Sequence, residues 1–408
     1  MKRKQPRIRS YEGVSELDTE AALKLLSKGR KSWNAWVNEN PRFDINFSGV
    51  DFADFVEDDL LDFSGFIFPE GNIDFYKAKF PDCKICFSDV DLSRASISFE
   101  EADFTGGDLT FGAVQFGSGN VVFLGAKFGQ GDLVFVGTSF EECSLIFNSC
   151  TFGPGHIIIK KCSFGDSEIL FENAVIDRLV TIENIHTPSL KNISFSGSSL
   201  NGSINLSNLR LNTVVDLTNT SLSHHLSLDN IKLNLQRKSY FLIFRKSMSG
   251  SDSRRFRRLK ELAEISKDHD SSLELHAQEH RAARWHSFNT VDSILDTIYS
   301  AISNYGRSIL RPLILLCFTW CSFGFMYFKL ASFSNLEQVD LMALSGVSIL
   351  SSLPFLTVSR DARSQFISSF LNDSQNIELF FIAIGFQGVI STLLLFLVGL
   401  ALRNRFRL

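Results

Sequence analysis

A twelve-residue repeat constrains this chain more than any other feature of its sequence. Counting in steps of twelve from Phe63 to Phe171, ten successive positions are apolar, and all but Ile159 are phenylalanine. A second bulky apolar residue follows each of them by five positions, from Phe68 to Ile176. Leu, Ile or Val precedes the first position by two residues, and a mostly small residue precedes the second by two. The unit is therefore h-x-F-x-x-a-x-F-x-x-x-x, a pattern that fits neither an α-helix nor a long flat strand.

This repeat predicts an all-β solenoid over residues 46–235. Alternation within each half of the unit places both apolar side chains on the same side of a short strand. Gly and Asp crowd the steps between, as in GQGD, where the chain must turn a corner. A fixed short period is typical of a solenoid. Twelve residues are too few to circle a packed core, so we expect two units, about 24 residues, in each coil.

The phenylalanines are expected to stack into a ladder that holds the solenoid together. Each buried Phe contributes about 2–3 kcal/mol of transfer free energy, which compensates for the small amount of regular strand. The central members of the predicted ladder are Phe111, Phe116, Phe123, Phe128, Phe135, Phe140, Phe147 and Phe152.

Phrases such as ADFTG (102–106) and AKFGQ (126–130) resemble those of pentapeptide-repeat proteins. The resemblance implies a right-handed β-helix with a four-sided coil. This sequence departs from the strict pattern because every second unit carries two extra residues. After residue 195 the spacing of the apolar positions tightens to alternating five and six.

The stretch 1–45 is expected to be an N-terminal helical cap, because a solenoid end otherwise exposes an apolar face and unpaired strand edges. Its apolar residues are at broadly helical spacing, and Pro41 ends the pattern. They are Leu23, Leu25, Leu26, Trp33 and Trp36.

Charge is divided unevenly along the chain. Residues 44–235 contain 26 Asp and Glu against 11 Lys and Arg, a net charge of −15, while the whole chain carries −4. The remainder therefore carries +11, much of it next to apolar segments. An acidic body and a basic, apolar end indicate a soluble module attached to a membrane. No apolar run follows the basic start MKRKQPRIRS, so we expect no signal peptide.

Residues 304–408 are predicted to be a membrane domain. The run 312–328 has 17 uncharged residues and the run 379–402 has 24, which predicts spans at about 309–331 and 379–402. Basic residues flank both runs, which by the positive-inside tendency places both termini in the cytoplasm of a multi-pass protein of the inner (cytoplasmic) membrane. These residues are Arg307, Arg311, Arg403, Arg405 and Arg407.

The semi-apolar stretch 339–358 is expected to be re-entrant or interfacial, since a third span would move the basic C-terminus to the outside. Backbone of this kind is tolerated at membrane depth only inside protein or beside a water-filled cavity. Together with polar residues of the second span, it supplies the candidate pore or helix-interface residues: Gln387, Ser391, Thr392 and Pro354. The alternative is that Gln387 only joins helices together.

Residues 236–303 are predicted to be a helical, basic juxtamembrane linker. Its RRFRRLK motif (254–260) is expected to contact anionic headgroups through Arg254, Arg255, Arg257 and Arg258, and a nucleic-acid ligand is a weaker alternative. A helix after Asn289 has an apolar stripe from Val291 to Ile302, which is expected to lie against the membrane or a partner helix.

No motif indicates catalysis or a cofactor. We find no glycine-rich phosphate loop, no G-x-S-x-G and no paired carboxylates, so we expect the protein not to be an enzyme. Cys83 and Cys86 lack a second pair at zinc spacing, and the order of His276, Glu279 and His280 is not that of a metalloprotease.

The C-terminal third carries a second resemblance. FRRLKELAEISKDHD, YGRSILRPL (305–313), SLPF (352–355) and LALRNRFRL are similar to segments of bacterial membrane proteins with pentapeptide repeats. The resemblance implies a helical stretch that joins the β-helix to a two-span domain whose layout is like that of two-helix ion-channel pores.

Two functions remain open at this level. The first is a membrane-anchored protein whose acidic β-helix docks a cytoplasmic protein partner or scaffolds an assembly. The second is an oligomeric ion channel or membrane-permeabilising effector with the β-helix as sensor. A homo-oligomer is expected, because two spans cannot enclose a pore.

Overall fold

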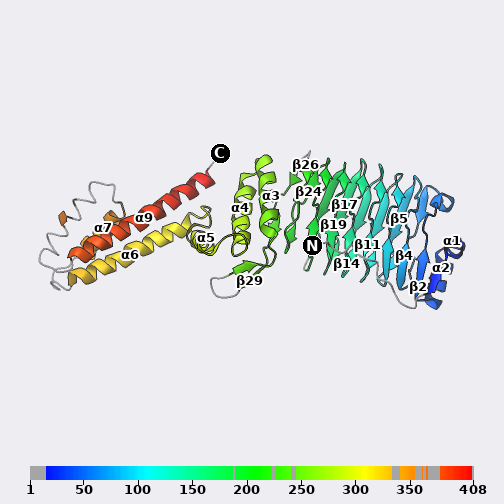
Figure 1. Ribbon diagram of the computed structural model, residues 1–408, viewed down its shortest axis with the longest axis horizontal. Coiled ribbons are helices and arrows are strands. Elements are labelled where there is room, and N and C mark those ends of the chain that lie inside the picture. Colours follow the sequence, from blue (N-terminus) through cyan, green and yellow to red (C-terminus); the bar gives the residue numbers. More distant parts are fainter. Residues whose placement is uncertain are drawn as a thin grey trace. The chain divides into compact units, whose positions relative to one another are not determined.

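The computed structural model describes residues 15–186, 189–222, 226–228, 230–239, 245–332, 341–353, 361, 364–365 and 377–406. The chain forms two compact units, residues 1–287 and 288–408. Strands fill most of the first unit and helices fill the second (Figure 1).

Four sheets of parallel strands make up the body of the first unit. Two of them have eight strands each. The first consists of β1 (Ser15–Leu17), β2 (Phe43–Asn46), β4 (Gly71–Asp74), β7 (Ala95–Ser98), β11 (Val121–Val122), β15 (Leu145–Ile146), β19 (Glu168–Leu170) and β22 (Asn192–Ser194). The second consists of β3 (Leu60–Asp62), β5 (Lys84–Ser88), β9 (Leu109–Gly112), β13 (Leu133–Val136), β17 (His156–Lys160), β21 (Leu179–Glu183), β24 (Ile204–Asn205) and β27 (Leu226–Ser227).

The other two sheets consist of very short strands. The third comprises β8 (Asp103–Phe104), β12 (Lys127–Phe128), β16 (Thr151–Phe152), β20 (Val175–Ile176), β23 (Ser199–Leu200) and β26 (Ser221–Leu222). The fourth comprises β6 (Asp91–Leu92), β10 (Gln115–Phe116), β14 (Ser139–Phe140) and β18 (Ser163–Phe164). Two further pairs follow, β25 (Arg210–Leu211) with β28 (Lys232–Leu233), and the antiparallel β29 (Arg237–Ser239) with β30 (Arg245–Ser247).

Strand pairing follows the predicted interval. Gln115 of β10 pairs with Ser139 of β14, and polar contacts along the stack also join residues 24 apart. Where the spacing of apolar residues tightens, the interval becomes 22, as between Ser199 and Ser221. Many parallel strands at a constant interval fit a β-helix.

The predicted ladder phenylalanines are buried and stack on one another from strand to strand. Phe123 is fully buried, and its ring centroid lies 4.8 Å from that of Phe99 on one side and 4.8 Å from that of Phe147 on the other. Phe111 stacks on Phe135 at 4.7 Å. The members Phe116 and Phe140, and Phe128 and Phe152, stack in the same way.

A left-handed backbone residue recurs every twelve positions, directly before the small inward residue of each unit. Glycine adopts this conformation at Gly125 and Gly137, but other residues adopt it at equivalent positions: Lys77, Asp89, Glu101, Ala113, Ser149, Lys161 and Asn173. The left-handed turn explains why one half of the unit needs a fixed number of residues, while its strain is tolerated because the stack defines the backbone on both sides.

Replacing Ala113 with glycine is therefore expected to stabilise the first unit by about 0.5–1 kcal/mol. Ala113 has φ 52° and is exposed, so its side chain contributes strain without buried contacts. Thermal unfolding of the full-length protein should show the change as a raised midpoint. The control is Ala126→Gly, at the buried inward position, which should lower the midpoint.

Helices close both ends of the stack. At the N-terminal end lie α1 (Thr19–Leu26) and α2 (Arg30–Glu39), with the 3-10 helix η1 (Phe52–Phe55) close by in sequence. Trp33 of α2 is fully buried, donates from Nε1 to the carbonyl of Ile67 at 2.9 Å, and packs on Phe47. At the other end, α3 (Asp252–Ile265) and α4 (His269–Ala283) add Phe256 and Leu275 to the same hydrophobic core.

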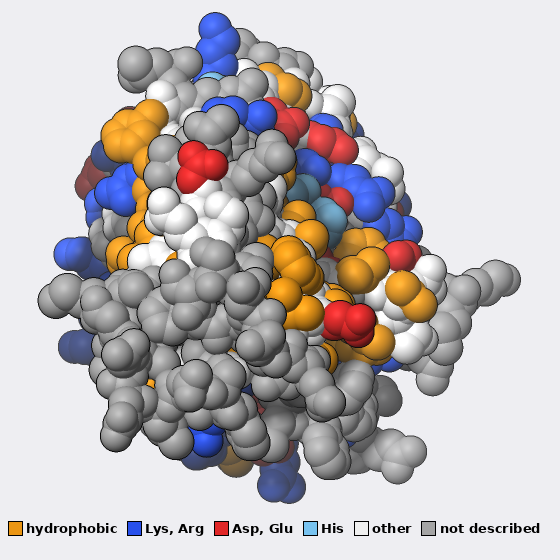
Figure 2. Space-filling view, turned by 90° about the vertical axis from the view of Figure 1, so that its left-hand side faces the viewer, with side chains coloured by type: hydrophobic (Ala, Val, Ile, Leu, Met, Phe, Trp, Pro, Cys, Tyr) orange, Lys and Arg blue, Asp and Glu red, His pale blue; other side chains and the backbone are white. Residues whose placement is uncertain are grey.

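The second unit contains α5 (Thr290–Ser303), α6 (Leu310–Ser332), α7 (Leu341–Ser351) and α9 (Ile377–Arg405) among its described residues. Residues 310–330 of α6 and the whole of α9 are long and apolar enough to cross a membrane, judged by length and composition alone. Many of their large hydrophobic side chains are exposed, and hydrophobic side chains are visible on the surface in Figure 2. They include Ile314, Phe318, Phe325, Phe386, Val389 and Phe396.

Candidate functional site

A buried polar cluster joins α6, α7 and α9, and we call it the Gln387 cluster. Gln387 of α9 is fully buried, and its Oε1 accepts a hydrogen bond from Tyr327 Oη of α6 at 2.6 Å. Its Nε2 donates to the carbonyl of Ser348 at 2.7 Å and lies 3.1 Å from Ser352 Oγ. Both ends of the Gln387 amide are therefore bound within one chain, as a helix-joining role requires.

Residue spacing explains why α7 supplies two of these partners. Ser348 and Ser352 are four residues apart, so they lie on one face of a helix. Ser348 Oγ also donates to the carbonyl of Trp320 at 2.9 Å, which ties α7 to α6. Apolar side chains surround the cluster, and hydrogen bonds gain strength in such a low-dielectric setting. These side chains are Val347, Phe380, Ala383 and Ile384.

The remaining predicted pore or interface residues are placed differently. Ser391 is buried one turn beyond Gln387, and its Oγ has no hydrogen-bond partner. The same is true of Ser351 Oγ on α7 and of Trp320 Nε1. Thr392 is exposed, and Pro354 lies outside the described residues. Buried hydroxyl and indole groups normally have partners, so these three mark where the unit has unused polar capacity.

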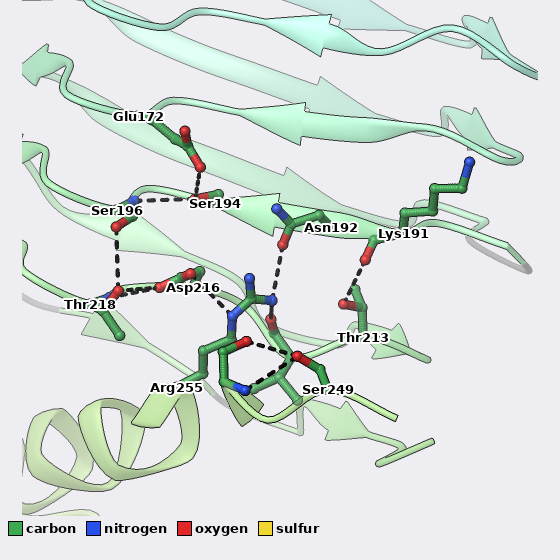
Figure 3. Close-up of polar contacts among 12 residues, drawn as sticks. Glu172, Lys191, Asn192, Ser194, Ser196, Thr213, Asp216, Thr218, Ser249 and Arg255 are labelled. Atoms are coloured by element: carbon green, nitrogen blue, oxygen red, sulfur yellow. Dashed lines mark hydrogen bonds and ion pairs between the residues drawn. The ribbon is translucent and has the colours of Figure 1, made fainter. Parts of the chain in front are cut away.

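Most of the RRFRRLK motif binds protein rather than facing outward. Arg255 Nε lies 3.1 Å from Asp216 Oδ2, and its Nη1 donates to Asn192 Oδ1 at 3.0 Å (Figure 3). The Arg255 side chain is only 11% exposed. Arg258 donates to the carbonyl of Thr220 at 2.8 Å. The predicted headgroup contact is therefore wrong for Arg255 and unsupported for Arg258, because both side chains fasten α3 to the end of the strand stack.

The same motif also joins α3 to α4. Arg257 and Lys260 donate to the two oxygens of Glu279, both at 2.8 Å. Burial alone would raise the pKa of Glu279, but the hydrogen bonds from Lys260 and Arg257 outweigh it and hold the pKa below its usual value. Arg254 is exposed, as are Arg403 and Arg405, and Arg407 lies outside the described residues.

Acidification should loosen this junction. A carboxyl group with a lowered pKa in the folded state contributes stability that is fully present above the ordinary Glu value of 4.5. The contribution is lost as the pH falls from there through the lower folded pKa. Thermal unfolding at pH 6 and pH 4 should therefore show a larger fall for the wild type than for Glu279→Gln. Equal falls in the two proteins would contradict the role of the Glu279 carboxylate.

A groove of about 930 Å³ lies beside the N-terminal helices of the first unit. One wall carries Lys28, Arg30 and Lys31. The other wall carries the exposed carboxylates Asp54, Glu57, Asp58 and Asp62. Buried apolar side chains, including Leu61 and Phe66, form part of its lining. Among the described residues no ion pair joins the two walls, so the charges of this groove are open to a ligand.

The described residues contain no group of three or more side chains suited to hold a metal ion. His276 and His280 lie with ring centroids 4.5 Å apart on α4. Burial, then the neighbouring His280 and Lys260, lower the pKa of His276. Cys83 and Cys86 are both free thiols.

The sequence did not point to Tyr327, Ser348 or Ser352 as partners of Gln387. The serine spacing in SGVSILSS (345–352) was the available signal, because it repeats at helical intervals within an apolar stretch. The acidic partners of RRFRRLK, Asp216 and Glu279, were not predicted either.

Comparisons with known proteins give little further identification. No protein-family profile matches the chain, and no curated protein matches it. Among solved structures, the trypsin-treated form of QnrB1, a plasmid-mediated fluoroquinolone resistance protein, aligns over 47% of this chain and 82% of its own, at 14% identity. The TM-score is 0.20, so the likeness gives no basis for assigning fold or function.

Proposed function

We propose that the chain is a multi-pass protein of the bacterial inner membrane whose residues 46–235 form a right-handed, pentapeptide-like β-helix in the cytoplasm. In this proposal the β-helix docks a protein partner or scaffolds an assembly, and the chain has no catalytic activity, cofactor or nucleic-acid ligand. The constant pairing interval supports the β-helix.

The arrangement of the second unit supports the membrane topology. Asn404 near the end of α9 donates from Nδ2 to the carbonyl of Gly306, just before α6, at 3.2 Å. The start of one candidate span therefore lies beside the end of the other. Arg307, Arg311, Arg403 and Arg405 then share one side, which the positive-inside tendency makes cytoplasmic.

The short helix α7 supports the re-entrant assignment. Its 11 residues extend about 16 Å, roughly half of a bilayer core of about 30 Å. Its serines bind Gln387 of the second span, which keeps polar groups satisfied at membrane depth.

The observation that carries the docking function is the groove of the first unit. Four exposed carboxylates on one wall and apolar side chains in the lining suit a protein segment that carries Lys or Arg beside apolar residues. Like charges gathered on one wall strengthen the local potential and speed the encounter with a basic partner.

A charge reversal tests this function. Asp54→Lys with Glu57→Lys should abolish cross-linking of the full-length protein to its partner in native membranes, detected by mass spectrometry. The matched control is Glu141→Lys with Glu142→Lys, which makes the same charge change at exposed residues outside the groove. Equal capture by both variants and the wild type would overturn docking in the groove.

The unpartnered Ser351 and Ser391 favour a second candidate, an oligomeric ion channel. Polar groups inside a membrane are costly and are commonly placed toward a bundle interior or a cavity. The mass of the full-length protein in lipid nanodiscs separates the candidates, because a monomer with two spans cannot enclose a pore. A closed ring of four or more copies that conducts ions in liposomes would favour the channel.

A further inference from the structure

Helix α5 has its apolar face outward and its polar face inward. Val291 and Leu295 are 65% and 59% exposed, and Ile294 and Ile298 lie on the same exposed face. Ser293, Asp296 and Ser303 are buried instead. A helix on the surface of a water-soluble protein has the opposite arrangement, so water is not the expected surrounding of this face.

Specific hydrogen bonds hold the polar face in place. Tyr305 Oη donates to Asp296 Oδ2 at 2.9 Å, and both residues are buried. Arg311 Nη1 donates to the carbonyl of Ser300 at 3.1 Å. Ser303 Oγ accepts from the backbone N–H of Gly306 at 3.1 Å. These contacts fix which side of α5 points away from the unit.

The position of α5 within the second unit identifies what covers the exposed face. It packs against both α6 and α9. The turn after it lies against the end of α9, where a side chain at Gly306 would meet Leu400 and Asn404. The exposed apolar surface continues from α5 onto Leu310 and Ile314 of α6.

We propose that α5 lies in the headgroup layer of the bilayer, with its apolar stripe among the acyl chains and the nearby arginines at anionic headgroups. This inference rests on the proposed function, namely that α6 and α9 cross the membrane. The mixed geometry suits an interfacial helix, since apolar side chains enter the acyl boundary while Arg307, Arg311 and Arg403 remain at the charged layer.

The test places a photoreactive residue, p-benzoylphenylalanine, at single positions in the full-length protein in nanodiscs of phosphatidylethanolamine and phosphatidylglycerol. The positions are Leu295 on the α5 stripe, Ile314 on the candidate span, and Val175 on the strand stack, all exposed. Intact-protein mass spectrometry then counts lipid adducts after irradiation.

Lipid adducts at 295 and 314, with none at 175, are expected. Adducts at 314 without adducts at 295 would overturn the inference and leave the proposed spans intact. Cross-links from 295 to a second copy in place of lipid would also overturn it. An absence of adducts at 314 would instead overturn the proposed membrane function.

A second variant tests how α5 is oriented. Tyr305→Phe removes only the hydroxyl that binds Asp296, so the adduct yield at 295 should fall by about threefold or more, with the yield at 314 unchanged. The matched control is Tyr299→Phe, a half-buried residue of α5 whose hydroxyl does not bind Asp296, and it should leave both yields unchanged. An unchanged yield at 295 in Tyr305→Phe would overturn this role of the hydrogen bond.

Discussion

Phe123→Ala is expected to lower the free energy of unfolding of the first unit by about 3–5 kcal/mol. Phe123 is fully buried and stacks between Phe99 and Phe147, so its removal leaves a cavity inside a continuous column of rings. The neighbouring layers limit collapse into this cavity, because each strand is bonded to the layers on both sides.

Chemical denaturation of the full-length protein, followed by hydrogen exchange, measures this effect. Loss of protection should be greatest in β7, β11 and β15, since contacts in a stacked array are mostly between neighbours. Val136→Ala is the matched control, because Val136 points outward from β13 and is partly exposed. A loss below about 1 kcal/mol for Phe123→Ala would contradict the ladder as the main source of stability.

Arg255→Ala is expected to cost about 3 kcal/mol, the lower end of the range for breaking a buried ion pair. The substitution leaves Asp216 only 13% exposed and without its cation, although Asp216 still accepts hydrogen bonds from Thr218. It also leaves Asn192 Oδ1 and the carbonyl of Val214 without the Arg255 donor. Hydrogen exchange should become faster in α3 and α4 before it does so in the central strands.

The adjacent Arg254→Ala is the control, because Arg254 has the same side chain but is exposed. Its effect should stay within about 0.5 kcal/mol. A double-mutant cycle with Asp216→Ala isolates the coupling between the two charges. Zero coupling would show that Arg255 acts through packing rather than through its ion pair.

The body of the fold was predictable because its information is local and repeated. The interval of 24 followed from two twelve-residue units, and the later interval of 22 matches the tighter spacing of apolar residues. Glycine at the corners has an equally local reason, since a side chain at Gly117 would overlap the carbonyl of Ser93. The left-handed residue was missed because Lys, Glu and Ala also occupy it.

The site was predictable only in part, because its contacts join distant segments. Gln387 stands out as a polar residue in an apolar run, but its partners lie 60 and 39 residues away in the sequence. RRFRRLK shows five positive charges and does not show that Asp216 and Glu279 face them. Charge alone therefore suggested a lipid contact where the structure has a junction.

The constant pairing interval has a consequence for how such a chain can change over evolutionary time. A duplication or deletion of 24 residues within the stack would add or remove one whole layer and leave the helices at both ends joined to their usual strands. A change of 12 residues would instead bring a strand of the first sheet opposite the second, as the positions of β11 and β13 show. The reach of this module can therefore vary in steps of about 4.8 Å while both of its ends are inherited unaltered.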